Sequence, residues 1–248
     1  MGRLAGRACV VTGGARGIGR EIALAFAREG ADVAVIDRRG DLAADTAATA
    51  STNGVQAHAF TADVSMEQEV SAAISAAEAA LGRIDVLVNN AGIITTAPLA
   101  DMPVPMWDEM IAVNLRSVFL CSKAVLPGMA RRRFGRIVNI SSQLGHKGAP
   151  NMAHYSAAKA AIIGFTRSLA REAVRDGINV NAICPGAITT ELGGDIPSGL
   201  RARRLAEIPL GRFGAVGEIA PTAVLLASSE GDYFVGATMN LNGGDVMV

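Results

Sequence analysis

The chain of 248 residues is poor in cysteine and in aromatic side chains, which make up 4% of it. Its three cysteines are far apart in the sequence and lie in apolar runs, at Cys9, Cys121 and Cys184. Their odd number and wide spacing argue against a disulfide framework and favour buried thiols in a reducing compartment. The histidines His58, His146 and His154 show no ligand spacing among themselves or with the cysteines, so we expect no metal site.

An excess of charge of either sign is also missing. Lys+Arg and Asp+Glu are both 23, so the formal net charge is zero. A nucleic-acid-binding protein normally has a basic excess, and we therefore expect no nucleic-acid partner. No uninterrupted apolar run reaches the roughly 18 residues of a membrane span, and the first residues lead directly into a strand pattern instead of a secretory signal. We expect a soluble cytoplasmic protein with no membrane partner.

Half of the residues are hydrophobic, and they gather in short runs that alternate with longer helical patterns. The expected strands are 8–12, 32–37, 56–61, 84–89, 136–141, 179–184 and 238–241, and the expected helices are 17–30, 41–53, 67–81, 114–132, 154–176 and 216–229. Several of the strands are apolar nearly throughout, as strands covered on both faces must be. The alternation predicts an α/β fold, a Rossmann-like doubly wound parallel sheet of about seven strands with helices on both faces. We expect one domain over 1–248, with the ligand at the carboxyl ends of the strands and the irregular segment 189–213 as a substrate lid.

A glycine-rich segment follows the first expected strand and opens the first expected helix. It reads Thr12-Gly13-Gly14-Ala15-Arg16-Gly17-Ile18-Gly19. Gly13 would allow a tight turn, Gly17 would let the backbone approach a pyrophosphate, and Gly19 would permit close helix–strand packing. The N-terminus of the helix would supply free N–H groups and a positive dipole to the phosphates. The spacing differs from the commoner G-x-G-x-x-G, but Asp37 ends the second strand about 20 residues further on, where a ribose-binding acid is expected.

Asp37 also bears on the choice of coenzyme. A carboxylate there accepts hydrogen bonds from ribose hydroxyls and repels the 2′-phosphate of NADP, at a cost on the order of 4 kcal/mol for unit charges about 4 Å apart at an effective dielectric near 20. Arg16 and Arg38 favour the opposite choice, because a guanidinium pairs well with a phosphate. Since direct repulsion should outweigh two solvent-screened arginines, we expect NAD, with NADP less favoured.

Tyr155 and Lys159 are four residues apart at the start of a helical pattern and therefore share one helix face. A neighbouring ammonium stabilises a phenolate, and lowering the tyrosine pKa by about 3 units requires roughly 4 kcal/mol. Tyr155 would then serve as general acid–base for the hydroxyl proton of an alcohol. Ser142 follows a buried strand, where its hydroxyl can stabilise a developing alkoxide, whereas Ser141 should point to the opposite side. The amide of Asn114 could hold a water or a helix carbonyl near Lys159.

Together these residues resemble the short-chain dehydrogenase/reductase family. The resemblance rests on the glycine-rich segment, Asn89-Asn90-Ala91-Gly92, Asn114, Ser142, Tyr155, Lys159, Pro185-Gly186 with Thr190, and Asn242-Gly243-Gly244, so it covers nearly the whole chain. It implies a Ser–Tyr–Lys–Asn tetrad in which Tyr155 is the acid–base and Ser142 positions the carbonyl. Lys159 would bind the nicotinamide ribose and depress the tyrosine pKa, and Asn114 would hold the water of a proton relay.

The same resemblance implies contacts to the coenzyme and an assembly. Asp63 and Val64 would flank adenine, and Ile188 and Thr190 would contact the carboxamide end. The family usually forms tetramers, so we expect a homotetramer built through the helices at 114–132 and 154–176 and the last strand. The expected cofactor-binding residues are Gly13, Arg16, Gly17, Ile18, Gly19, Asp37, Asp63, Val64, Asn90, Ala91, Gly92, Tyr155, Lys159, Pro185, Gly186, Ile188 and Thr190.

We therefore expect an NAD-dependent oxidoreductase that transfers a hydride between nicotinamide and a secondary alcohol or ketone. The expected substrate pocket contains Ser142 and Tyr155 together with Ile94, Leu144, Asn151, Met152 and Leu192. This mixed set does not choose among polyols, sugars and other small carbonyl compounds. His146 and His154 adjoin the site, but we expect solvated loop histidines; Arg201, Arg203 and Arg204 could bind an anionic substrate, although exposure to solvent is the simpler interpretation.

Two alternatives remain open. The first is an NADPH-dependent 3-oxoacyl-(acyl-carrier-protein) reductase, for which the basic triplet 131–133 would dock an acidic carrier. Such reductases typically carry a second basic residue at the end of the Tyr/Lys helix, where this chain has Asp176. The second alternative is a catalytically silent cofactor-binding scaffold, against which the intact tetrad argues.

Overall fold

The structure is a computed structural model that describes residues 2–190 and 198–248. Its main sheet has seven strands in the order β3-β2-β1-β4-β5-β6-β9, and every neighbouring pair is parallel. The strands are β1 (Ala8–Thr12), β2 (Asp32–Asp37), β3 (Ala57–Thr61), β4 (Val86–Asn89), β5 (Gly135–Ile140), β6 (Ile178–Pro185) and β9 (Thr238–Leu241). The doubly wound α/β fold expected from the sequence is confirmed.

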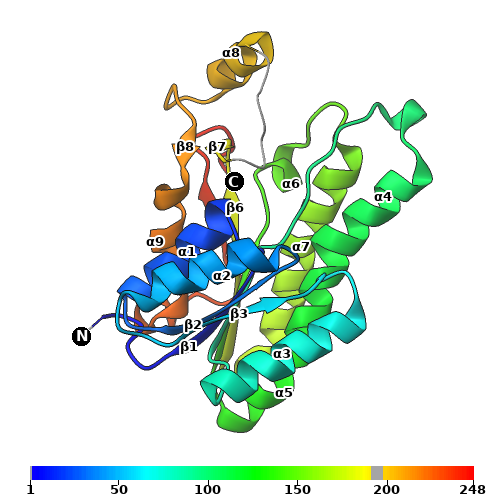
Figure 1. Ribbon diagram of the computed structural model, residues 1–248. Coiled ribbons are helices and arrows are strands. Elements are labelled where there is room, and N and C mark those ends of the chain that lie inside the picture. Colours follow the sequence, from blue (N-terminus) through cyan, green and yellow to red (C-terminus); the bar gives the residue numbers. More distant parts are fainter. Residues whose placement is uncertain (1, 191–197) are drawn as a thin grey trace.

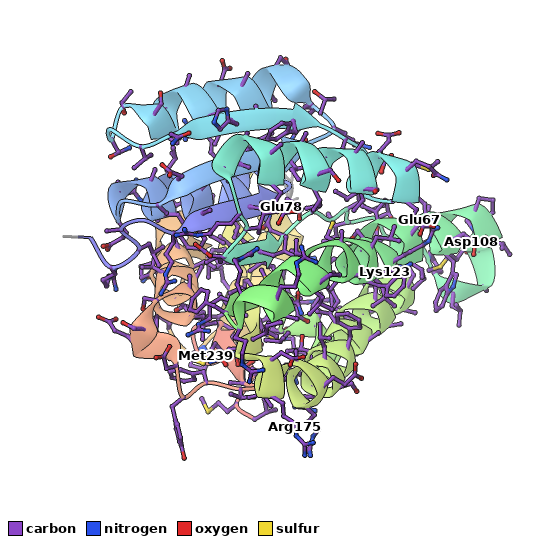
Figure 2. All side chains as sticks on the ribbon, turned by 90° about the horizontal axis from the view of Figure 1, so that it is seen from below. Glu67, Glu78, Asp108, Lys123, Arg175 and Met239 are labelled. Carbon is purple, nitrogen blue, oxygen red and sulfur yellow. The ribbon has the colours of Figure 1, made fainter. Side chains whose placement is uncertain are left out.

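Helices cover both faces of this sheet (Figure 1). One face carries α1 (Gly17–Arg28), α2 (Gly40–Ser51) and α9 (Ala220–Ala227), and the other carries α3 (Glu67–Leu81), α5 (Ser117–Arg132) and α7 (Ala153–Ala173). Because both faces are covered, the central strands β1, β4, β5 and β6 are buried at every position. The edge strands β3 and β9 are only partly buried, apart from one exposed residue in β3. On the outer surface, Lys123 of α5 reaches Glu67 of α3 at 3.6 Å (Figure 2).

The order of the strands reverses between β1 and β4. The chain builds outward from β1 to β3 and then returns to the other side of β1. In a parallel sheet this reversal leaves a crevice outside the carboxyl ends of the two strands, where ligands bind. The register pairs Thr12 with Ile36 and Val11 with Val88, so the segments after β1, β2 and β4 meet at one edge of the sheet.

The helix expected from residue 114 is the second part of a longer helical run. It begins with α4 (Val104–Ile111), continues through a π-turn at Ala112–Arg116, and ends with α5. By length and composition alone this run could cross a membrane. In the structure α5 places Leu120, Val125 and Met129 in the hydrophobic core against the sheet, as a core helix of an α/β protein does.

The segment 189–213 is more regular than its composition indicated. It contains α8 (Ser198–Glu207), and it is flanked by β7 (Ile188–Thr189) and β8 (Gly214–Ala215), which pair in parallel. Glycines and prolines on both sides of α8 concealed a run of good helix formers. A one-turn helix, α6 (Leu144–Lys147), was also not expected. The expected helix 216–229 is α9 with the 3₁₀ turns η5 (Val216–Glu218) and η6 (Ser229–Gly231) on either side. Two further 3₁₀ turns of the described residues are η1 (Leu99–Asp101) and η3 (Val174–Asp176).

Candidate active site

A cavity of about 680 Å³ lies along the carboxyl ends of the strands, within the size range of small-molecule sites. All four expected catalytic residues line it, and so do the expected cofactor-binding residues except Gly19. These are Gly13, Arg16, Gly17, Ile18, Asp37, Asp63, Val64, Asn90, Ala91, Gly92, Asn114, Ser142, Tyr155, Lys159, Pro185, Gly186, Ile188 and Thr190. Of the expected substrate residues, Ile94, Leu144, Asn151 and Met152 line the cavity, whereas Leu192 lies outside the described residues.

The glycine-rich loop has the backbone that close approach of a phosphate requires. Gly13 and Gly17 have φ of +63° and +57°, in the left-handed region that favours glycine. A Cβ on Gly13 would lie 2.7 Å from Cα of Ala91, whereas one on Gly17 would meet only Thr190, at 3.8 Å. The loop is therefore packed on its inner side and open toward the cavity at Gly17, as a pyrophosphate cradle must be.

Gly19 serves packing and does not line the cavity. A Cβ on it would lie 2.3 Å from Nδ2 of Asn90. That Nδ2 donates to the carbonyl oxygens of Thr12 (3.0 Å) and Gly13 (2.9 Å). In return Oγ1 of Thr12 accepts from the N–H groups of Asn90 (3.1 Å) and Ala91 (3.2 Å). The end of β4 thus holds the loop in place.

Asp37 is buried at the end of β2, and backbone groups hold its carboxylate. Oδ2 accepts from the N–H of Ala15 (3.1 Å), and Oδ1 accepts from the N–H of Arg39 (3.0 Å). The guanidinium of Arg39 lies 3.5 Å from Oδ1, and Arg38 is exposed at the same part of the cavity. Asp63 uses Oδ1 to accept from the N–H and the hydroxyl of Ser65 (2.9 and 2.7 Å), so its carboxylate caps the following turn.

The two serines after β5 both border the cavity but make different hydrogen bonds. Ser141 donates to the carbonyl oxygen of Lys159 at 2.6 Å and anchors α7 to the sheet. Ser142 faces the cavity, where its Oγ accepts from the N–H of Leu144 at 3.1 Å and its side chain is hydrogen-bonded to Tyr155. Ser142 and Tyr155 therefore form a hydroxyl pair that can hold one substrate oxygen.

We expected Lys159 to lower the pKa of Tyr155, and for the protein without coenzyme this expectation is wrong. Burial raises the pKa of Tyr155, and the hydrogen bond with Ser142 only partly offsets this. Lys159 lies 5.7 Å from the tyrosine ring centre, and its Nζ donates to the carbonyl oxygen of Ile140 at 2.9 Å. Burial also lowers the pKa of Lys159 to about 8. Desolvation thus disfavours both charged forms, the phenolate and the ammonium.

Asn114 lies in the π-turn and is fully buried. Its Nδ2 donates to the carbonyl oxygens of Ile93 (3.1 Å) and Met110 (3.2 Å). Its Oδ1 has no hydrogen-bond partner within the described residues. A Cβ on Gly92 would lie 2.6 Å from this oxygen and 3.7 Å from Nζ of Lys159. The amide therefore aims an acceptor at the space beside Lys159, as a water-holding role requires.

A charged cluster on the cavity wall was not found from the sequence. Nζ of Lys147 lies 3.0 Å from Glu207 of α8 and 2.5 Å from Asp245 near the C-terminus. Asp245 also accepts from Nε2 of Gln143 at 2.5 Å. All four residues line the cavity. They come from three distant segments with no shared motif, so no sequence spacing indicated the cluster.

The histidines do not contribute to the cavity wall. His154 is fully buried, with its Nε2 2.8 Å from Oγ1 of Thr95, and burial lowers its pKa. The expectation of a solvated loop histidine is therefore wrong for His154.

All three cysteines are buried, and none of them forms a disulfide, as expected. Within the described residues no cluster of three His, Cys, Asp or Glu side chains could hold a metal ion.

Comparisons with known proteins agree with this geometry. The model of the short chain dehydrogenase family matches residues 7–200. The chain is 43% identical to 2-(S)-hydroxypropyl-CoM dehydrogenase 3 of Xanthobacter autotrophicus, covering 98% of this chain and 97% of that protein. It is 41% identical to the 3-oxoacyl-(acyl-carrier-protein) reductase of Staphylococcus aureus, covering 97% and 98%.

A solved structure is also similar over nearly the whole length of both chains. The crystal structure described as a short-chain alcohol dehydrogenase from Sinorhizobium meliloti has a TM-score of 0.95 and 37% identity, covering 98% of this chain and 97% of that one. The chain therefore belongs to the short-chain dehydrogenase/reductase family of oxidoreductases, which use nicotinamide cofactors.

Proposed function

We propose that the protein is an NAD-dependent dehydrogenase that moves a hydride between C4 of nicotinamide and the carbinol carbon of a secondary alcohol or ketone. The observation that carries this proposal is the convergence of Ser142, Tyr155, Lys159 and Asn114 on one cavity with the glycine-rich loop. When bound, the nicotinamide supplies the hydride acceptor or donor. The side chains of the protein supply the proton chemistry.

Tyr155 is the proton carrier in this proposal. In the oxidation direction its phenolate takes the hydroxyl proton of the alcohol as the carbinol hydride leaves; in reduction its phenol returns that proton to the carbonyl oxygen. Ser142, already bonded to Tyr155, donates to the same substrate oxygen. Because burial raises the pKa of Tyr155, the phenolate depends on positive charge close by.

Lys159 and Asn114 support Tyr155 from the inner side of the cavity. Lys159 is held by the carbonyl oxygen of Ile140 and borders the same space as the free acceptor of Asn114. In the proposal Lys159 binds the nicotinamide ribose, and a water on Oδ1 of Asn114 relays the proton onward. Substitution of Asn114 would then affect proton transfer more than coenzyme binding.

Asp37 supports NAD as the coenzyme. Its carboxylate is buried and held by two backbone N–H groups, so it cannot turn away from a 2′-phosphate without losing both bonds. Arg39 lies beside it and weakens its negative charge, but Arg38 is exposed and screened by solvent. We expect a higher kcat/KM with NAD(H) than with NADP(H), and saturation by NADP(H) at lower concentration would overturn the assignment.

An NADPH-dependent 3-oxoacyl-(acyl-carrier-protein) reductase is the second candidate, because relatives of that name are 41% identical. Two members of the basic triplet that would dock the carrier, Arg132 and Arg133, make contacts within the protein. Arg132 donates to the carbonyl oxygen of Ile84 at 2.5 Å, and Arg133 lies 3.7 Å from Asp176. These contacts favour a structural role for the triplet and a small-molecule substrate for the enzyme.

The function is tested by assaying NADH and NADPH oxidation with a sugar ketone, a cyclic ketone, a 3-oxo ester and an acyl thioester. We expect turnover of a small ketone with NADH, and Tyr155→Phe should lower kcat at least about 100-fold while NADH binding, followed by fluorescence, is unchanged. An active Phe variant would contradict the mechanism. Turnover of the thioester with NADPH alone supports the second candidate, and no turnover with NADH still bound supports a silent scaffold.

We further propose a homotetramer in the cytoplasm. Large apolar side chains are exposed on α5, one of the helices that the family uses for assembly, at Phe119, and shortly before the last strand, at Tyr233 and Val235. Exposed large apolar side chains of this kind favour contact with another chain. The three free thiols favour a reducing compartment.

A further inference from the structure

Two arginines of α8, the exposed Arg203 and the half-buried Arg204, line the cavity without an ion pair or hydrogen bond to any described residue. Figure 1 shows α8 above the carboxyl end of the sheet, at the same end of the molecule as α6. The residues proposed to bind adenosine follow β2 and β3, at one side of the sheet, whereas α8 comes after β6, at the other side. Arg203 and Arg204 are therefore cations of the substrate end of the cavity.

The acidic side chains next to these arginines are already neutralised in part. Glu207 and Asp245 share the ammonium of Lys147, at 3.0 and 2.5 Å. The pKa of Glu207 is lowered first by the hydrogen bond from Lys147 and then by the charges of Arg203 and Arg204, which places both arginines within its electrostatic reach. Three cations thus face two carboxylates, and the cluster keeps one net positive charge.

One more carboxylate, that of Glu109 in α4, lines the cavity outside this cluster and is exposed to solvent. No ion pair joins it to α8 within the described part of the chain.

The cavity wall also has apolar side chains beside the charged cluster of Lys147, Glu207 and Asp245. Leu144 and Met152 lie beside Ser142 and Tyr155, and Ile208 and Phe213 follow α8. A substrate that spans this distance would place its carbinol at Ser142 and Tyr155, an apolar linker along the wall, and its far end at α8. The far end would meet two guanidinium groups, whose planar donors match oxyanions in two-point contacts.

We propose that Arg203 and Arg204 form an anion subsite that selects alcohols and ketones carrying a carboxylate, sulfonate or phosphate at the end remote from the carbinol. This inference rests on the proposed dehydrogenase function and names its substrate class. Arg203 and Arg204 are specificity-determining residues in it and take no part in the hydride or proton step.

The test uses matched ketones and both reduced coenzymes. The anionic substrates are 5-oxohexanoate, 5-oxohexane-1-sulfonate and 5-oxohexyl phosphate, and the neutral counterpart is methyl 5-oxohexanoate. We expect at least one anion to exceed the neutral ketone in kcat/KM by about tenfold, the order of one charge-assisted contact in partial solvent. The identity of that anion distinguishes the three chemistries.

Arg203→Met/Arg204→Met should abolish the preference by raising KM for the anion and leave kcat/KM for the neutral ketone unchanged. Arg203→Lys/Arg204→Lys keeps the charge and should retain part of the preference. The matched control is Arg175→Met, because Arg175 points away from the molecule at the far end of α7 (Figure 2). An equal kcat/KM for anionic and neutral ketones, or a preference that survives in the Met variant, would overturn the subsite.

Binding measurements separate failure of the subsite from failure of the dehydrogenase function. Calorimetry of the enzyme with NADH measures the affinity for hexanoate, hexane-1-sulfonate and hexyl phosphate, none of which can be reduced. Binding to the wild type that is lost in the Met variant and weakened by salt supports the subsite even if no ketone is turned over. Absence of binding to the wild type overturns it whatever the activity.

Discussion

Lys159 is 4% exposed, and burial lowers the pKa of its ammonium from 10.5 to about 8. One carbonyl oxygen, that of Ile140, accepts from its Nζ, which is too little to replace the water that a charged group loses on burial. The same desolvation raises the pKa of Tyr155. At the scale of single residues, burial thus keeps Tyr155 as the neutral phenol at pH 7, whereas Lys159 still carries its proton there but releases it far more readily than a lysine in water.

The lowered pKa of Lys159 predicts how stability depends on pH. The unfolded lysine, with a pKa of 10.5, holds its proton between pH 8 and 10.5, where the folded one has released it. Because the unfolded state binds more protons in this window, the contribution of Lys159 to stability rises with pH, by about 2 kcal/mol between pH 7 and pH 9.5. Urea unfolding of the wild type and of Lys159→Met at both pH values measures it.

The comparison with Lys159→Met is necessary because Tyr155 and the buried cysteines also titrate above pH 8. We expect the difference in unfolding free energy between wild type and variant to shift in favour of the wild type as the pH rises. If the unfolding free energies of the two proteins changed with pH in the same way, burial would not destabilise the charged form of Lys159.

At the scale of elements, the site depends on two departures from regular helix geometry. The π-turn at Ala112–Arg116 inserts one extra residue into the helical run, and such insertions are frequent at functional sites. This turn lets the side chain of Asn114 point inward and donate hydrogen bonds to the carbonyl oxygens of Ile93 and Met110. The other departure is the start of α1, where glycine permits contact between helix, loop and the end of β4.

Gly19→Ala tests the packing at the start of α1. The added Cβ would lie 2.3 Å from Nδ2 of Asn90 and from the carbonyl oxygen of Gly13. We expect a loss of about 1–3 kcal/mol in unfolding free energy from overpacking, together with weaker NADH binding because the loop is displaced. Thermal unfolding and fluorescence titration measure the two effects.

Gly164→Ala is the matched control for this substitution, because Gly164 is a helical glycine of α7 with no atom within 4 Å of an added Cβ. It should raise the unfolding free energy by about 0.5–1 kcal/mol through helix propensity. If Gly19→Ala did not lower the unfolding free energy either, the short distance from Gly19 to Asn90 would not require glycine at position 19.

At the scale of the whole molecule, exposed apolar side chains indicate how chains associate. Phe119 of α5 is 47% exposed although its neighbours Val118 and Leu120 are buried. A large aromatic ring left in water favours burial against a second copy. The proposed homotetramer would cover this ring and the exposed side chains near β9.

Light scattering tests the assembly. We expect a mass of about 100 kDa, four times the 25.5 kDa of the chain, as the family resemblance and the exposed apolar surface imply. Phe119→Glu should shift the mass to a smaller species by burying an unpaired charge, whereas Ala48→Glu on the exposed side of α2 should not. A monomeric wild type, or an unchanged mass in the Phe119 variant, would contradict the proposal.

Most strands of the sheet, and many of the residues proposed to bind the coenzyme, could be predicted because short stretches of the sequence indicate them. Continuous apolar runs mark strands covered on both faces, and glycines mark the positive φ values at positions 13 and 17. The boundaries of β3, β4, β5 and β6 shifted by one or two residues, because hydrogen bonding with neighbours, and not composition, ends a strand. Helices α4, α6 and α8 were missed, since prolines and glycines around them masked short helical segments.

By itself the sequence determined the alternation of strands and helices, the phosphate loop, and the pairing of Tyr155 with Lys159 on one helix face, because each depends on residues close together in the chain. The tertiary structure decided the rest. It set the pKa values of that pair through burial, turned Asn114 inward through the π-turn, and joined Lys147, Glu207 and Asp245 on one wall. Desolvation and long-range contacts arise only once distant segments pack together, so no local pattern carries them.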